Sequence, residues 1–339
     1  MWKTIRSLIY DWAAALRWES QRKASVNATD ADQNEPSPES TMRFRRFVRP
    51  ALPPLQIALM LLGLWGCSLM DPGQEIPAYL IVPDIQFSPG ENEGTASINV
   101  TDLWVYSSTD VVGIFPLPAV VPILPVDVQD GPLTLLAGIR ENGISNSRAP
   151  YPFYTTVEHL SSDVAGSRDT LLPVVELVEG VRLLRVEDFE NSNVFGSLAG
   201  GEGWVRTDEE AAIFEGEYSG QISVDVDVPL VRVRTVEQEY NLQGGVPAFL
   251  ELDYRCDQTF AVGLYGYRDG LETKHLALII NPTEGAGVDP LWNKLYVDLG
   301  PSINAQGVAD HFEVYVECIL EAERESGSVG LDNLRILTY

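Results

Sequence analysis

Histidine and cysteine are scarce in this sequence of 339 residues, which contains three of each. His159, His275 and His311 lie far apart, and none stands beside a Ser or Cys in a nucleophile motif. The sequence also lacks GxSxG, HExxH and phosphate-binding glycine motifs, which are the usual signatures of serine hydrolases, zinc peptidases and nucleotide-binding enzymes. The sequence therefore predicts that the protein is not an enzyme.

Lys and Arg are also scarce in most of the chain. Residues 1–66 carry nine Lys and Arg and six Asp and Glu. Of the chain's 23 basic and 49 acidic residues, 14 and 43 therefore lie in residues 67–339, a formal charge of −29. Only Lys274 and Lys294 are lysines in that part. Nucleic acids are held by clustered Lys and Arg, so this composition excludes a nucleic-acid partner. The acid excess fits either a protein exposed to a high-salt environment or an ordinary acidic exported protein.

A short export segment, residues 42–66, is the strongest signal in the sequence. Four Arg follow Met42 without an intervening acid, and residues 55–65 form an apolar run of 11 residues. A run of this length fits a signal peptide, whereas a membrane-spanning helix needs about 20 apolar residues. A plain secretory signal is one interpretation of the segment.

The end of this segment, Leu64-Trp65-Gly66-Cys67, resembles the lipobox of bacterial lipoproteins. The resemblance implies cleavage between Gly66 and Cys67 and attachment of acyl chains to the Cys67 thiol. Several acyl chains would hold the mature protein at the outer membrane, where it could be exposed at the cell surface. Residues 67–75 would then form a short tether.

Residues 1–41 do not fit in front of such a signal. Lipoprotein signals begin at their own Met, and Met42 stands directly before the Arg cluster. The end of this stretch is polar, acidic and contains Pro, which is typical of disorder. We interpret residues 1–41 as an over-long gene start, with a genuine N-terminal extension as the alternative.

Two β-rich segments follow the tether. Residues 76–180 alternate apolar and polar positions, with frequent Pro and Gly, and their length fits a small immunoglobulin-like sandwich. Residues 181–339 contain six or seven further alternating runs separated by turn signals, as in a jelly-roll-like sandwich. The predicted fold class is all-β. The string FPLPAVVPIL has three Pro, so we expect it at a sheet edge or in a crossover.

Two family resemblances rest on short strings. TDLWVY, VGIFPLPAVVPIL, LLAGIRENGIS and RAPYPFY together resemble an uncharacterised family of two-domain outer-membrane lipoproteins of Bacteroidota, over roughly residues 76–339. That resemblance implies no established activity. EDFE, GEYSG and LDNLRI resemble jelly rolls of the carbohydrate-binding-module type, whose terminal strands run side by side. This second resemblance supports the fold more than a ligand.

The resemblance to such jelly rolls also implies one candidate metal site. In those proteins an acid near the first strand and an Asp in the last strand often share a structural Ca²⁺ with loop carbonyls, and Ca²⁺ requires oxygen ligands. The matching positions here are Asp188, Glu190, Glu217 and Asp332. The alternative is that they are solvated acids. No other cofactor is expected.

Aromatic residues and cysteines give the remaining candidates. Trp204, in the loop GGEGW, is the best candidate for an exposed ring that stacks on a sugar, whereas Trp292 and Tyr296 are expected in the core. Cys256 and Cys318 each share the parity of apolar neighbours, so both should point into the core. They are predicted to form a disulfide or to remain two buried thiols.

The sequence thus predicts a lipid-anchored outer-membrane lipoprotein with a non-enzymatic binding or assembly role in an envelope protein complex. A surface glycan-binding module is the alternative, and a glycan-active enzyme is a third possibility. An exposed aromatic patch would favour a glycan, and a large apolar patch or open strand edge would favour a protein partner. An enzyme would need two carboxylates about 5–9.5 Å apart in a cleft.

Overall fold

The computed structural model describes residues 75–108, 110–191, 193–236, 239–283 and 291–339. They belong to one compact unit, Gly73–Tyr339. The expected export segment, its cleavage site after Gly66 and the lipidation site Cys67 lie outside the described residues. No helix in the described part of the chain is long and apolar enough to cross a membrane.

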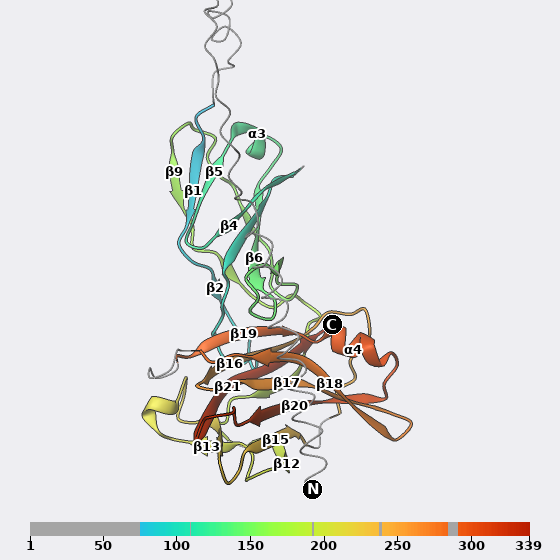
Figure 1. Ribbon diagram of the computed structural model, residues 1–339. Helices are drawn as coiled ribbons and strands as arrows, with labels where there is room; N and C mark the ends of the chain where they lie inside the picture. The colour runs from blue at the N-terminus through green and yellow to red at the C-terminus, as the bar shows by residue number, and fades with distance from the viewer. Residues whose placement is uncertain (1–74, 109, 192, 237–238, 284–290) are drawn as a thin grey trace, which may run out of the picture. The chain divides into compact units, whose positions relative to one another are not determined.

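The N-terminal β part contains two principal sheets (Figure 1). The β1 sheet has the order β5-β1-β9 and comprises β1 (Ala78–Val82), β5 (Ala119–Ile123) and β9 (Arg168–Thr170). The β3 sheet comprises β3 (Asp102–Tyr106), β4 (Val111–Pro116), β6 (Leu133–Arg140), β7 (Arg148–Pro150) and β8 (Val157–His159). A short parallel pair joins β2 (Gln86–Phe87) to β10 (Val174–Val175), and α3 (Pro125–Val128) is a single helical turn.

Buried and partly exposed residues alternate along strands of these sheets, as the sequence predicts. In β1, Ala78, Leu80 and Val82 are buried and the residues between them are partly exposed. The proline-rich string also lies where it was expected, because β4 and β5 are each at the edge of a sheet. Pro122 of β5 therefore needs no ladder partner for its missing N–H on the open side.

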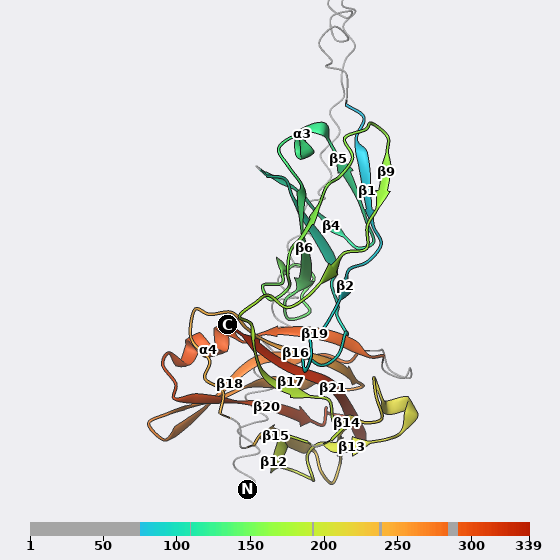
Figure 2. The same ribbon diagram turned by 180° about the vertical axis from the view of Figure 1, so that it is seen from behind.

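The C-terminal part is a sandwich of two sheets (Figures 1 and 2). The β21 sheet has the path β13-β14-β21-β16-β19, with β11 also paired to β21. Its strands are β11 (Arg182–Glu187), β13 (Val205–Thr207), β14 (Ser219–Asp225), β16 (Ala248–Cys256), β19 (Asn293–Asp298) and β21 (Ser326–Thr338).

The β20 sheet has the order β12-β15-β20-β17-β18. Its strands are β12 (Phe195–Ala199), β15 (Leu230–Thr235), β17 (Phe260–Arg268), β18 (Leu271–Ile280) and β20 (His311–Ile319). Two short helices, η2 (Glu210–Ala212) and α4 (Gly300–Gln306), complete the part. The all-β fold class is confirmed, and β11 and β21 run side by side as the jelly-roll resemblance implies.

The β21 sheet is covered on both faces. Its inner face contributes Leu250, Leu252 and Leu331 to the core of the sandwich. Its outer face contributes Phe249 and Leu337 to the core of the N-terminal β part. Strands β16 and β21 are consequently buried over most of their length, polar residues included.

Candidate functional site

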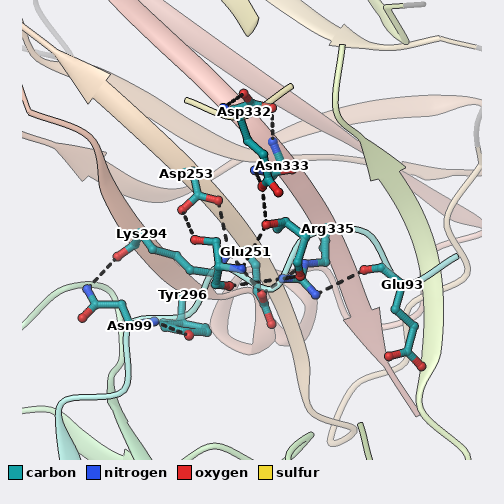
Figure 3. Close-up of polar contacts among 12 residues, drawn as sticks. Glu93, Asn99, Glu251, Asp253, Lys294, Tyr296, Asp332, Asn333 and Arg335 are labelled. Atoms are coloured by element: carbon teal, nitrogen blue, oxygen red, sulfur yellow. Dashed lines mark hydrogen bonds and ion pairs between the residues drawn. The ribbon is translucent and has the colours of Figure 1, made fainter. Parts of the chain in front are cut away.

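A buried ion pair lies on the outer face of the β21 sheet. Glu251 of β16 and Arg335 of β21 are register partners, and Arg335 Nε is 3.5 Å from Glu251 Oε2. The Arg335 guanidinium also donates to the carbonyl oxygens of Glu93 (3.2 Å), Thr95 (2.9 Å) and Ser97 (3.3 Å). Figure 3 shows Arg335 between Glu251 and the Glu93 segment. One cation thus binds the segment 93–97 to the last strand of the sandwich.

Glu251 is the centre of the charge balance. Tyr151 donates its hydroxyl to Glu251 Oε1 at 2.6 Å, and Lys294 Nζ is 3.6 Å from Glu251 Oε2. A buried carboxylate is tolerable only when it is paired and hydrogen-bonded. Burial and the Glu251 carboxylate raise the pKa of Tyr151, which stays protonated as a donor. Burial alone would lower the pKa of Arg335, but Glu251 raises it above its ordinary value.

A second carboxylate, Asp253, continues the network along β16. Ser97 donates its hydroxyl to Asp253 Oδ1 at 2.8 Å, and Lys294 Nζ is 3.5 Å from Asp253 Oδ2. Asn99 binds the next strand, because its backbone N–H donates to the Tyr296 hydroxyl at 2.9 Å. Burial raises the pKa of Asp253 despite the opposing effect of Lys294.

Asp332 ends the network on β21. Its Oδ2 accepts a hydrogen bond from the Ser219 hydroxyl at 2.6 Å, and its Oδ1 accepts the backbone N–H of Asn333 at 2.8 Å. Burial raises the pKa of Asp332 to about 7, against the lowering effect of these hydrogen bonds. Asn333 also donates to Glu215, which accepts a hydrogen bond from the Thr95 hydroxyl.

The carboxylates Glu251, Asp253 and Asp332 are buried and bound by neighbouring groups. A cavity of about 610 Å³ lies beside the same segment, and its lining mixes polar residues such as Asp84 and Gln86 with apolar residues such as Phe87 and Ile98. Glu251 and Asp253 are not part of that lining. We therefore call the residues 93–99, Glu251, Asp253, Lys294, Tyr296 and Arg335 the polar joint, and assign it to the attachment of residues 93–99 to the sandwich.

Beyond the polar joint, the same sheet face carries a half-exposed aromatic pair. The rings of Phe214 and Trp292 lie 5.3 Å apart and are tilted by 53°. Phe214 is 37% exposed and Trp292 is half-buried. The Arg255 guanidinium lies 5.7 Å from the Trp292 ring centre. We call Phe214, Arg255, Trp292 and Gly330 the aromatic shelf.

Neighbouring residues hold the two rings of the shelf in place. A Cβ at Gly330 would lie 3.3 Å from Trp292 Cη2 and 2.9 Å from Arg255 Cγ, so glycine lets the indole and the Arg255 stem lie close to β21. Arg255 Nη1 donates to the Ala211 carbonyl of η2, and Ser219 accepts the Phe214 backbone N–H at 3.1 Å. The loop that carries Phe214 is thereby attached to the sheet at both ends.

The outer face of the β20 sheet is polar and internally paired. Lys274 Nζ lies 2.9 Å from both carboxylate oxygens of Glu317. The Tyr267 hydroxyl lies 2.7 Å from Glu272 and 2.9 Å from Glu313. Burial lowers the pKa of Lys274, with Glu317 opposing that effect. Because these groups bind one another, this face is a less suitable ligand-binding surface than the aromatic shelf.

The four acids expected to bind Ca²⁺ are used in other ways. Glu190 Oε1 accepts the backbone N–H of Glu217 at 2.8 Å, and Asp188 Oδ1 accepts that of Glu190 at 3.1 Å. Asp332 binds Ser219, as described above. Among the described residues, no group of three or more His, Cys, Asp or Glu could hold a metal ion. The structure therefore does not bring the four acids together as a ligand set.

The Arg206 guanidinium binds the loop carbonyls beside Glu190. Arg206 Nη2 donates to the Glu190 carbonyl at 2.6 Å, and Nε donates to the Phe189 carbonyl. The Arg206 guanidinium also lies 4.0 Å from the ring centre of Tyr218. Arg206 thus binds the turn 189–190 to β13.

The expectation that Trp204 is exposed is wrong. Trp204 is 4% exposed and packs against Phe189 and Phe195, with ring centres 6.0 and 6.3 Å away. Gly203, at φ +85°, makes the turn that directs Trp204 into the sandwich, and a Cβ there would lie 2.9 Å from Val233. The half-exposed tryptophan of this part is Trp292, which was expected in the core. Tyr296 is buried as expected.

The cysteine parity is confirmed, but the disulfide is not formed. Cys256 and Cys318 are both fully buried in the sandwich core and both are free thiols. They come from opposite sheets, and each has its own partner. The Cys256 thiol donates to the Asn281 carbonyl at 3.4 Å, and Gln258 donates to Cys318 Sγ at 3.2 Å. Burial raises the pKa of both thiols to about 12.

The histidines remain separate in the fold. His159 Nε2 lies 2.9 Å from Asp169, His275 binds Gln306, and His311 stacks on Tyr267 with ring centres 4.4 Å apart. His159 and His311 have their partners on neighbouring strands and His275 has its partner in α4, and the three histidines are not brought together.

Comparisons with known proteins give fold-level similarities only. No family model matches the chain, and no curated protein matches it. A carbohydrate-binding module of family 29 is 10% identical, with a TM-score of 0.30, and the match covers 47% of this chain and 87% of that chain.

A family 61 module in complex with β-1,4-galactotriose is 11% identical, with a TM-score of 0.27 and coverage of 48% and 90%. A cleaved adhesin domain of the Lys-gingipain of Porphyromonas gingivalis is 13% identical, with a TM-score of 0.32 and coverage of 45% and 96%. Similarities of this size do not identify a ligand for this chain.

Proposed function

We propose that this protein is a non-catalytic glycan-binding protein of the cell envelope, and that the aromatic shelf is its binding surface. The observation that carries the proposal is the half-exposed Phe214–Trp292 pair on the outer face of the β21 sheet. Sugar rings pack their C–H faces on aromatic faces, and most ligand sites combine such apolar contact with a few polar groups. Arg255 supplies a donor beside the ring.

The arrangement supports binding rather than cleavage. The nearest carboxylate along β16, Asp253, is 1% exposed and is bound by Ser97 and Lys294. Glycoside hydrolysis needs two accessible carboxylates on either side of the sugar bond. The shelf residues themselves carry no carboxylate, so we assign them recognition of a glycan without chemistry on it.

The expected location is part of the same proposal. Acyl chains on Cys67 would hold the protein at the outer membrane, and the charge of −29 over residues 67–339 would keep it soluble at a charged cell surface. Mass spectrometry of the mature N-terminus, with and without Cys67→Ser, tests the anchor separately from the ligand.

The alternative assembly role has weaker support. β4 and β5 are sheet edges, which can pair with a strand of another protein, and Val111, Ile114 and Val120 are exposed on them. However, Pro116 ends β4 and Pro122 lies within β5. Proline on an edge strand blocks strand addition, so this edge disfavours pairing.

A panel of neutral oligosaccharides tests the glycan proposal, with affinity measured by calorimetry. We expect Trp292→Ala and Phe214→Ala each to weaken binding at least about fivefold, because stacking on an aromatic ring typically contributes about 1 kcal/mol or more. Tyr106→Ala is the matched control, because Tyr106 is also half-buried on a strand but belongs to the β3 sheet. Binding that survives Trp292→Ala and Phe214→Ala unchanged would contradict the shelf as the site.

A further inference from the structure

Large aliphatic side chains are exposed at the end of the N-terminal β part where the described chain begins. They are Ile76 (63% exposed), Leu124 (38%), Val126 (56%), Leu160 (80%) and Val164 (63%). We call these five residues the apolar end. Single exposed aliphatic residues are ordinary, but several that gather on one surface mark an interaction site.

Contacts between three separate segments show that these residues lie together. A cavity of about 530 Å³ is lined by Val126 of the apolar end and by Glu75 and Asp163, which precede Ile76 and Val164 in sequence. The backbone N–H of Gly166 donates to the Pro77 carbonyl at 3.1 Å, so the loop after Leu160 lies beside the start of β1. Figures 1 and 2 both show α3 at the end where β1 begins.

The chain that precedes Glu75 limits what can lie against this end. Cys67 is eight residues before Glu75. An extended chain spans at most ~3.6 Å per residue, so the backbone of Cys67, to which the acyl chains would be attached through its side chain, would lie within about 29 Å of Glu75. A lipid surface is therefore the large apolar partner that is always within reach of the apolar end in an anchored protein.

We propose that the apolar end docks on the lipid surface that holds the Cys67 acyl chains, with Leu160 and Val164 entering the interface. This inference rests on the lipid anchor of the proposed function and is independent of glycan binding. Glu75, Asp127 and Asp163 lie among these residues, so the preferred surface is uncharged or zwitterionic and an anionic surface is repelled. Docking would set the orientation of the protein on its membrane.

Co-sedimentation with phosphatidylcholine vesicles tests the docking without the acyl chains. The protein is the mature chain carrying Cys67→Ser. We expect weak binding that falls at least about fivefold in Leu160→Ser/Val164→Ser, because two buried aliphatic side chains are lost. Val308→Ser is the matched control, because Val308 is 79% exposed but lies in the C-terminal sandwich. Equal sedimentation of the double variant and its parent would overturn the proposal.

Hydrogen exchange on the lipidated protein gives a second readout. On vesicles, relative to detergent solution, amides of residues 158–166 should exchange several-fold more slowly, and amides of residues 305–310 should not change. Unchanged exchange at 158–166 would count against docking, as would vesicle binding that increases with anionic lipid. Loss of glycan binding alone would contradict the shelf and leave the docking result standing, whereas absence of acyl chains on Cys67 would remove the anchor.

Discussion

Arg335 and Glu251 form an ion pair on adjacent strands of the β21 sheet, 3.5 Å apart and each no more than 1% exposed. Arg335 also binds three backbone carbonyls of the segment 93–97. The pair therefore joins the last strand of the sandwich to residues that come before the first strand of the β3 sheet.

Removing one member of this pair should cost much more than removing both. Arg335→Met leaves the buried Glu251 carboxylate with Lys294, 3.6 Å away, as its remaining cationic partner, and we expect a loss of about 3–5 kcal/mol in the free energy of unfolding. Arg335→Met combined with Glu251→Gln should recover part of that loss, because no uncompensated charge remains. Urea unfolding of the parent, Arg335→Met, Glu251→Gln and the double variant measures the difference. If the double variant is as unstable as the sum of the two single variants, the charge balance described here is wrong.

Asp332 should make stability fall as the pH rises. Its carboxyl has a pKa of about 7 in the folded chain against an ordinary value of 3.8, so the folded state binds the proton more tightly than the unfolded state does. This contribution is fully present below about pH 4 and is lost as the pH rises towards 7, with a slope of at most roughly 1.4 kcal/mol per pH unit.

Asp332→Asn should remove that slope. The variant should gain stability relative to the parent between pH 5 and pH 8, because an amide does not ionise. Urea unfolding at both pH values checks this, with Asp127→Asn on the exposed α3 as the control. A parent and variant whose stability difference is the same at pH 5 and pH 8 would show that Asp332 does not titrate in this range.

The core thiols should be unreactive in the native protein. Cys256 and Cys318 are fully buried, and burial raises their pKa values to about 12, so the thiolate population at pH 8 is very small. In the Cys67→Ser chain we expect no labelling by a thiol reagent at pH 8 under native conditions and two labelled thiols in denaturant. A mass lower by two hydrogens before reduction would show a disulfide instead.

Local sequence patterns predicted the strands well where one face of the strand is buried. Ala78, Leu80 and Val82 alternate with exposed neighbours, and Cys318 follows the parity of the apolar residues before it. The same patterns could not predict the polar joint. Glu251 in β16 has the position of a solvent-facing residue, and its partner Arg335 is 84 positions away in the chain.

The sequence predicted an exposed Trp204 and a core Trp292, whereas Trp204 is buried and Trp292 is half-buried, and the cause is similar. Trp204 follows glycines, which suit an exposed loop and a tight inward turn equally well, and only Val233 and Ser197 around Gly203 decide between them. Trp292 precedes an alternating strand, but its indole lies over Gly330, a residue on a strand distant in sequence. In both cases the deciding contact is made by a remote segment.

The central place of β21 has a consequence for how the protein is made. β21 pairs with β11, β14 and β16, and it supplies Arg335 to the polar joint. Until β21 has emerged, these three strands lack a common neighbour and residues 93–97 lack their cation. The C-terminal sandwich is therefore expected to be completed only after the last strand has been synthesised.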